Sequence, residues 1–194
     1  MAATNKTQGQ TPPAPDPRFV RRLCLLCCHT ARNIAYYRTG YLSEDGTGPL
    51  KHRTQFGATV NSNMLDIAVL EWCKLFADHR NGHHHWTRFV RDAEAQRQFL
   101  GVILTRNQIS RDTWQRYLDS MRVYRDKFVA HLDQGNVMDI PQLSIALECV
   151  LILYAHIHAH APAHVFDTPH LMALPHDLDA YYNACRQEAR DAYT

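Results

Sequence analysis

Residues 110–131, SRDTWQRYLDSMRVYRDKFVAH, are the stretch that decides the fold class. Apolar side chains recur in it every three or four residues, which is the spacing of one face of an α-helix. Ser110 stands just before the first of them, and serine is a favoured N-cap residue. We therefore predict an amphipathic helix from Ser110 to about His131, with an inward face formed by Trp114, Tyr117, Leu118, Met121, Tyr124, Phe128 and Val129.

Helical spacing also extends to both sides of this segment. We predict further helices over residues 17–37, 55–76, 86–104 and 139–160, and a last one from Asp177 to the end of the chain. Asp16 and Pro17 suit the N-cap and the first position of the first helix, and Gly40 its C-cap. No segment shows the alternation of a β-strand. The sequence predicts an all-α antiparallel bundle of four long helices with accessory helices, a single domain over residues 17–194 that follows a disordered tail over residues 1–16.

Composition restricts the classes of function. The chain has 194 residues, of which 45% are hydrophobic and 21% charged, and its net charge is +2. These values are not those of a disordered protein or a membrane protein. The charge is too balanced to give a positive field over the whole surface, so any polyanion must bind to a local patch. The 13 histidines are expected to change the net charge steeply between about pH 7 and pH 5.

Several features predict a cytoplasmic protein without a membrane partner. The first 17 residues contain no apolar core, so we expect no signal peptide. The most apolar run, residues 143–155, contains Glu148 and is too short to cross a bilayer. Five of the six cysteines fall in apolar helical stretches, which is typical of reduced thiols.

Neither the cysteines nor the histidines complete a metal site. The cysteines of residues 24–28 share the apolar face of a helix, and no second cysteine pair is present. The three consecutive histidines of residues 83–85 cannot all face one ion in an ordinary loop. His156 and His160 are spaced as ligands on one helix face, but no glutamate follows in the manner of a zinc protease. We predict no metal and no cofactor, and a small metalloprotein is the least favoured alternative.

The end of the opening segment carries the most informative motif. Arg125 is followed by Asp126 and, after five intervening residues in all, by His131. An arginine and a histidine at this spacing, in the string YRDKFVAHLD, resemble the R-x4–6-H motif of the HEPN superfamily, and the string looks like the abortive-infection type. The stretch SNMLDIAVLEWCKLF (62–76) is similar in character to the helix before the motif in such proteins. The resemblance covers roughly residues 20 to 160.

The resemblance implies a metal-independent endoribonuclease that acts in a defence or toxin–antitoxin setting. His131 can exchange protons near neutral pH. Arg125 can hold a phosphate and stabilise the charge that develops on it, and Asp126 can orient either residue. Members of this family place two copies of the motif across a dimer cleft. The resemblance therefore implies RNA as a partner, a homodimer, and an antitoxin protein as a further partner.

Two alternatives remain open for these residues. On an ideal helix, Arg125 and His131 are about 120° apart and about 9 Å apart along the axis, so they converge only if the helix frays or a second subunit completes the site. In a structural role, Arg125 is an ion-pair residue and His131 a C-terminal cap. The protein is then a non-catalytic HEPN-like module that binds RNA, a nucleotide or a partner protein.

Overall fold

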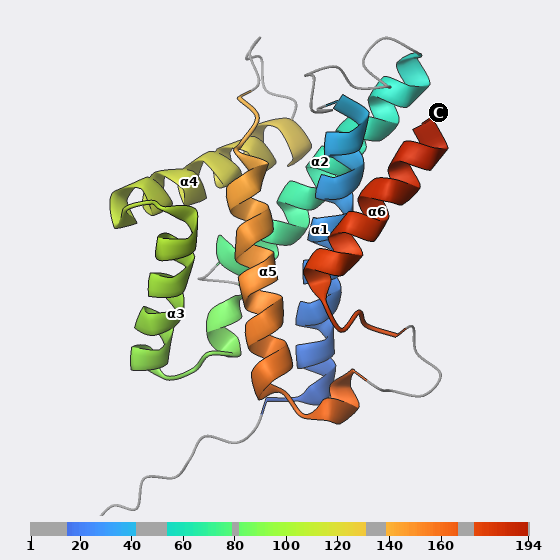
Figure 1. Ribbon diagram of the computed structural model, residues 1–194. Helices are drawn as coiled ribbons and strands as arrows, with labels where there is room; N and C mark the ends of the chain where they lie inside the picture. The colour runs from blue at the N-terminus through green and yellow to red at the C-terminus, as the bar shows by residue number, and fades with distance from the viewer. Residues whose placement is uncertain (1–14, 42–53, 79–81, 131–138, 167–172, 194) are drawn as a thin grey trace, which may run out of the picture.

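The protein is helical over the part of the chain that the structure describes. The computed structural model describes residues 15–41, 54–78, 82–130, 139–166 and 173–193. These residues contain no strand, and they form α1 (Pro17–Tyr41), α2 (Gln55–Phe76), the 3-10 helix η1 (Trp86–Arg88), α3 (Ala93–Asn107), α4 (Arg111–Tyr124), the π-helix η2 (Arg125–Ala130), α5 (Leu143–His160), the 3-10 helix η3 (Ala163–Val165) and α6 (Leu178–Tyr193) (Figure 1). The prediction of an all-α protein is confirmed.

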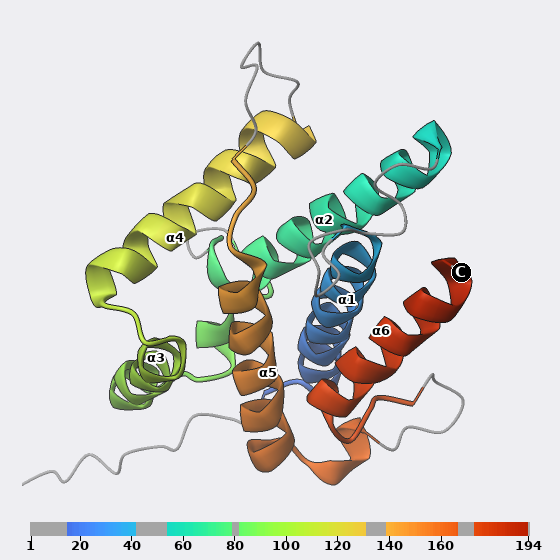
Figure 2. The same ribbon diagram turned by 45° about the horizontal axis from the view of Figure 1, so that its top comes forward.

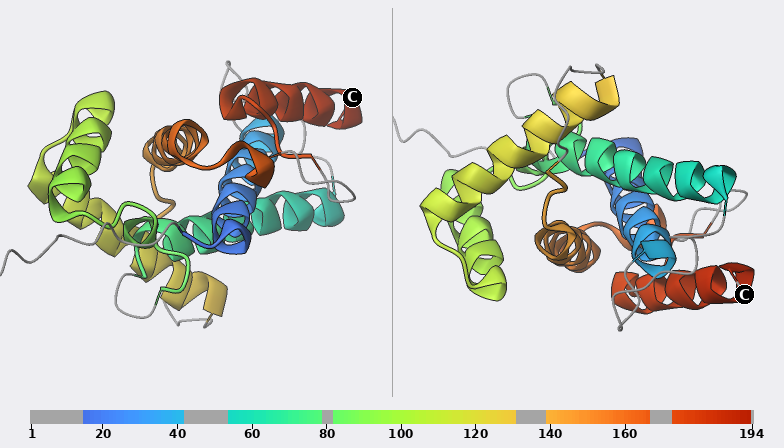
Figure 3. Two further views of the ribbon diagram at one scale, coloured as in Figure 1. Left: turned by 90° about the horizontal axis from the view of Figure 1, so that it is seen from below. Right: turned by 90° about the horizontal axis from the view of Figure 1, so that it is seen from above.

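Helix α1 lies at the centre of the arrangement. It contacts α2, α5 and α6, and both views in Figure 3 show it between α2 and α6. Helices α2 and α5 run opposite to α1, whereas α6 runs in the same direction, and α4 crosses α5 at a steep angle (Figures 1 and 2). Because α1 is covered on several sides, 14 of its 25 residues are buried. This position explains why its cysteines at 24, 27 and 28 lie in the core.

Most helix ends lie where the sequence predicts them, for local reasons. The bounds of α2 agree with the prediction. The Asp16 carboxylate accepts a hydrogen bond from the Arg18 N–H at 2.9 Å, and Asp177 accepts from the Asp179 N–H at 2.8 Å. Each of these side chains satisfies one of the N–H groups that the first turn of a helix leaves without a partner.

Other helix boundaries differ from the predictions. The segment predicted as one helix over residues 86–104 is divided, because the Asp92 side chain accepts from the Ala95 N–H at 2.7 Å and starts α3 there. Helix α5 begins at Leu143, later than predicted. Ser110 caps α4 as predicted, with its hydroxyl accepting from the Thr113 N–H at 3.1 Å. Beyond Tyr124 the chain continues as a π-helix instead of an α-helix, and the side chains of residues 128–130 are outside the described part.

Gly40 does not cap α1, which continues to Tyr41. It lies where α1 and α2 approach closely: a Cβ atom on Gly40 would be 2.3 Å from the side-chain oxygen of Asn61. Asn61 is fully buried, and its Nδ2 donates to the Tyr37 carbonyl at 3.2 Å. The glycine is therefore needed for space between two helices, and no turn requires it.

An aromatic cluster joins α2 to α4. Trp72 is stacked on Phe76, with ring centroids 5.1 Å apart. Trp114 and Tyr117, both from α4, present their rings edge-on to Trp72 at 6.0 and 5.4 Å. Such edge-to-face pairs add to the free energy of area burial. This cluster fixes α4, and therefore the start of the Arg125 motif, against the second half of α2.

Helix α5 is longer than the apolar run noted in the sequence. Over Leu143–His160 it has 18 residues and a mean hydropathy of 1.4, so by length and composition it is able to cross a membrane. The run of residues 143–155 is therefore part of a longer helix, whose length alone does not exclude a span. Half of the helix is buried inside the fold, as in the core helix of a globular protein. It is the one helix with these properties among the described residues.

Candidate functional site

The Arg125 motif begins where α4 changes its helical form. The N–H of Arg125 donates to the carbonyls of Arg122 and Met121, and the π-helix η2 then runs to Ala130. Short π-helical segments inside α-helices are rare and often occur at functional sites. The angular spacing of an ideal α-helix therefore does not apply between Arg125 and the end of the motif. His131 lies outside the described residues.

The guanidinium group of Arg125 is held by two carboxylates. Its Nε donates to Asp126 Oδ1 at 2.7 Å, and its Nη1 donates to a carboxylate oxygen of Asp78. The hydrogen bonds that Arg125 donates to Asp126 and to Asp78 raise its pKa, against the opposing effect of burial. The arginine side chain is 21% exposed. The guanidinium group thus keeps its proton at a fixed position that solvent reaches, with two carboxylates that balance its charge.

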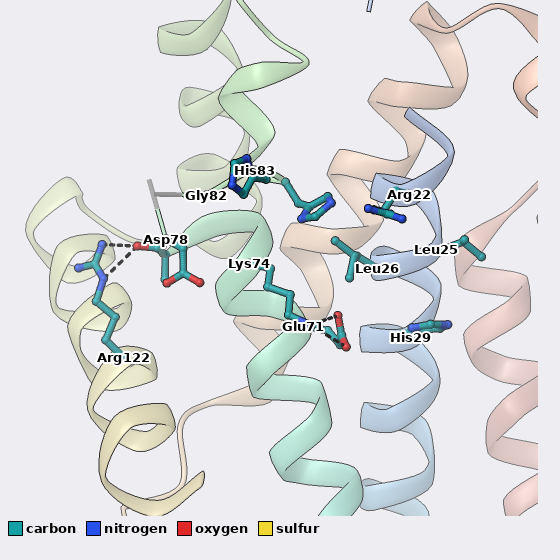
Figure 4. A pocket seen from close by; sticks show the side chains of 12 residues that line it. Arg22, Leu25, Leu26, His29, Glu71, Lys74, Asp78, Gly82, His83 and Arg122 are labelled. Carbon is teal, nitrogen blue, oxygen red and sulfur yellow. Dashed lines mark hydrogen bonds and ion pairs between the residues drawn. The ribbon is translucent and has the colours of Figure 1, made fainter. Parts of the chain in front are cut away.

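A second arginine, one turn earlier, contacts the same end of α2. Both Nε and Nη2 of Arg122 donate to the Ala77 carbonyl, at 3.1 and 2.8 Å, while Nη1 donates to Asp119 at 2.8 Å. The last carbonyls of a helix carry partial negative charge, which cations stabilise. Arg122 and Arg125 together bind the C-terminal end of α2 to the end of α4, and Figure 4 shows Arg122 beside Asp78.

A partly buried hydrogen bond to α2 also supports the end of α4. The Tyr124 hydroxyl donates to Asp66 Oδ1 at 2.8 Å. Burial raises the pKa of Asp66, and the hydrogen bond from Tyr124 partly offsets this. Burial and the Asp66 contact raise the pKa of Tyr124. The tyrosine immediately before Arg125 is therefore a neutral donor in a positioning contact.

A groove of about 1070 Å³ is lined by Arg122 and by Asp78, the partner of Arg125. Its walls come from α1, the end of α2, the segment that begins at Gly82, and Arg122 of α4. Its lining combines apolar surface with charged side chains of both signs: Arg22, Leu25, Leu26, His29, Glu71, Lys74, Ala77, Asp78, Gly82, His83, His84 and Arg122 (Figure 4).

The three consecutive histidines point to different environments. His85 is buried, and its Nε2 lies 3.0 Å from the Phe76 carbonyl while its Nδ1 lies 2.8 Å from the Thr87 hydroxyl. A carbonyl only accepts, so Nε2 carries the proton and Nδ1 is the acceptor. His85 therefore ties its segment to the end of α2, whereas His83 and His84 line the groove.

The described residues contain no group of three or more His, Cys, Asp or Glu side chains able to hold a metal ion. His156 and His160 lie side by side on α5, with ring centroids 4.2 Å apart, but no third ligand joins them among those residues.

The cysteines are not activated as nucleophiles. All six are buried and free. Burial raises the pKa of Cys24, Cys28 and Cys73 to about 12. A thiol reacts as its thiolate, so these groups are inert at neutral pH.

Of the residues predicted for the site, the structure brings Arg125 and Asp126 together and leaves His131 outside the described part. Sequence reasoning missed Asp78, the other carboxylate on Arg125. Asp78 lies 47 positions before Arg125, and no local pattern marks such a pair. The sequence marks Asp78 only by its position just after the predicted helix of residues 55–76.

Comparisons with models of protein families, with curated proteins and with solved structures found no match for this chain.

Proposed function

We propose that the protein is a HEPN-like antiparallel four-helix bundle in which the Arg125–His131 motif cleaves RNA without a metal ion. The proposal includes a cytoplasmic homodimer in a defence or toxin–antitoxin setting, with an antitoxin protein as partner. One observation carries it: the helix leaves the α form at Arg125, and two carboxylates there fix a partly exposed guanidinium group. A donor that is positioned in advance stabilises developing charge most effectively.

The chemistry assigns a separate task to each residue. A base removes the proton of the ribose 2′-hydroxyl, whose oxygen attacks phosphorus. The bond to the 5′-oxygen then breaks, this oxygen takes a proton, and a 2′,3′-cyclic phosphate remains. In the proposal His131 moves these protons, Arg125 stabilises the charge on the phosphate oxygens, and Asp126 orients Arg125 through the 2.7 Å hydrogen bond.

A second candidate is a non-catalytic module of the same fold that binds RNA, a nucleotide or a partner protein. It is favoured by the same two carboxylates, because Asp78 and Asp126 already occupy Nη1 and Nε of Arg125. In this role the arginine mainly joins α2 to the end of α4. The two candidates differ in what the removal of Asp78 does.

The test is RNA cleavage by the full chain in excess chelator, with analysis of the product ends. We expect 2′,3′-cyclic phosphate ends, and we expect His131→Gln to reduce the rate about 10²–10⁴-fold, the usual contribution of proton transfer. Arg125→Lys keeps the charge but loses the planar fork, so it should also reduce the rate. Arg116→Lys, on the exposed side of α4, is the matched control. Melting curves show whether each variant is folded.

Asp78→Asn separates the two candidates. If Arg125 binds phosphate, loss of the competing carboxylate should strengthen RNA binding, although the fold loses an ion pair. If Arg125 only joins the helices, the same change should lower the melting temperature and leave RNA binding unchanged. A wild-type protein that cleaves no RNA when free of any inhibitor, and whose RNA binding does not respond to Asp78→Asn, would contradict the ribonuclease proposal.

A further inference from the structure

The groove beside the Arg125 motif has the size and lining of a small-molecule site. Its volume of about 1070 Å³ is slightly above the usual range for ligand pockets, about 300–1,000 Å³. Leu25 and Leu26 form an apolar part of the α1 wall, and Glu71 lies on α2 among basic residues (Figure 4).

Basic side chains from three segments meet in this groove. Arg22 comes from α1, Lys74 from α2 and His84 from the segment after residue 81. Arg22 is exposed and has no hydrogen-bond or ion-pair partner among the described residues. Lys74 Nζ lies 3.1 Å from each oxygen of Glu71. Burial lowers the pKa of His84, and the charges of Arg22, His83 and Lys74 lower it further. The three basic side chains therefore lie close enough together in the groove for the charges of Arg22 and Lys74 to affect His84.

The segment that carries His84 is fixed in place from both sides. A Cβ atom on Gly82 would be 2.4 Å from the Asp78 carbonyl oxygen, so only glycine allows this close approach to the end of α2. Immediately after His84, the buried His85 is hydrogen-bonded to the Phe76 carbonyl at 3.0 Å. His84 is therefore held over the groove before any ligand arrives.

We propose that this groove binds the phosphate group of an organic phosphate ester, with Arg22, Lys74 and His84 as the hydrogen-bond donors. Phosphate accepts charge-assisted hydrogen bonds from such groups. The volume far exceeds that of a phosphate ion, which leaves room for the organic part beside Leu25 and Leu26. The Glu71 carboxylate accepts hydrogen bonds from hydroxyl groups of the organic part.

The site uses neither Arg125 nor His131, so it does not depend on the proposed ribonuclease activity. The ester has two sources, a small sugar phosphate or the backbone of a single-stranded RNA.

The experiment is calorimetric titration of the full-length protein in phosphate-free buffer. The probes are ribose 5-phosphate, ribose, and an RNA hexamer without terminal phosphates. Binding is located by the imidazole NMR signals of His84.

We expect Arg22→Gln and Lys74→Gln each to weaken binding about tenfold or more, as for the loss of one charge-assisted hydrogen bond. Arg190→Gln, on the exposed face of α6 and outside the groove, is the matched control. Helical spectra and melting curves confirm that each variant is folded.

Each outcome has a defined meaning. Saturable binding of ribose 5-phosphate, with ribose inert, supports a small phosphate ester, whereas saturable binding of the hexamer alone supports an RNA backbone. Binding of neither phosphate probe overturns the proposal. A loss of affinity in Arg190→Gln equal to that in Arg22→Gln also overturns it, because the attraction would then be unspecific. If the groove binds phosphate while RNA is never cleaved, only the ribonuclease proposal fails.

Discussion

Two arginines on successive turns, Arg122 and Arg125, hold different atoms at the end of α2. Arg125 pairs with the carboxylate of Asp78, a contact open to water and therefore of small net value to stability. Arg122 directs two N–H groups at the carbonyl of Ala77, a residue that is only 3% exposed. Arg125 thus makes ion pairs that water screens, whereas Arg122 satisfies a backbone acceptor that water reaches poorly.

Arg122→Ala should therefore destabilise the protein. A buried carbonyl that loses its donors costs about 1–3 kcal/mol, and we expect a decrease of this size in the free energy of unfolding, measured in urea. Arg116→Ala is the control, since the exposed Arg116 on the same helix donates, among the described residues, to the Thr113 hydroxyl alone, at 3.2 Å. Equal midpoints for both variants would show that Arg122 does not stabilise the end of α2.

At the scale of elements, the contact between α1 and α2 depends on a residue without a side chain. Gly40 and Asn61 meet so closely that a Cβ atom would be 2.3, 2.7 and 3.0 Å from three atoms of the asparagine. Asn61 is fully buried between the helices, and its Oδ1 has no hydrogen-bond partner among the described residues. Its side chain thus has little room to move away.

Gly40→Ala should cost about 1–3 kcal/mol, as is usual when a packed core receives an extra methyl group. Asn61→Ala removes the atoms that obstruct it. In that background Gly40→Ala should be neutral or stabilising, because alanine is favoured over glycine in a helix by about 1 kcal/mol. A double-mutant cycle of unfolding free energies measures this coupling. If Gly40→Ala has the same effect in both backgrounds, the close approach of α1 and α2 is not as described.

The same two elements show what a sequence can and cannot predict. Helix starts at Pro17, Arg111 and Leu178 follow capping residues, a signal carried within four positions, and they were predicted. The tight contact at Gly40 and the pairing of Arg125 with Asp78 join positions far apart in the chain. They depend on how the helices pack, which periodicity does not encode. The π-helix at Arg125 was missed for a related reason, since its i→i+5 bonds leave no distinct apolar pattern.

At the scale of the whole molecule, histidines in three places share one property. Burial lowers the pKa of His29 on α1, of His84 beside the groove and of His156 on α5. Neighbouring positive groups lower each pKa further. Arg32 and Lys74 lower the pKa of His29, and Arg22, His83 and Lys74 lower that of His84, while Glu71 opposes both effects. His160 lowers the pKa of His156.

This predicts a stability that falls on mild acidification. Below the unfolded pKa of about 6.5, the unfolded chain binds protons at these positions before the folded chain does, so unfolding becomes easier. The stability that the three histidines provide is complete above that pH and is lost as the pH falls toward the lowered folded pKa values.

We expect the free energy of unfolding in urea to decrease from pH 7.5 to pH 5, and the decrease to be smaller in a triple variant with His29→Gln, His84→Gln and His156→Gln. Asp66, whose pKa is raised from 3.8, has the opposite effect and is present in both proteins, so their difference isolates the histidines. His176→Gln, at an exposed position and not among the groups that lower the three pKa values, controls for the loss of an imidazole. If this control flattens the pH dependence as much as the triple variant does, the three histidines are not its source.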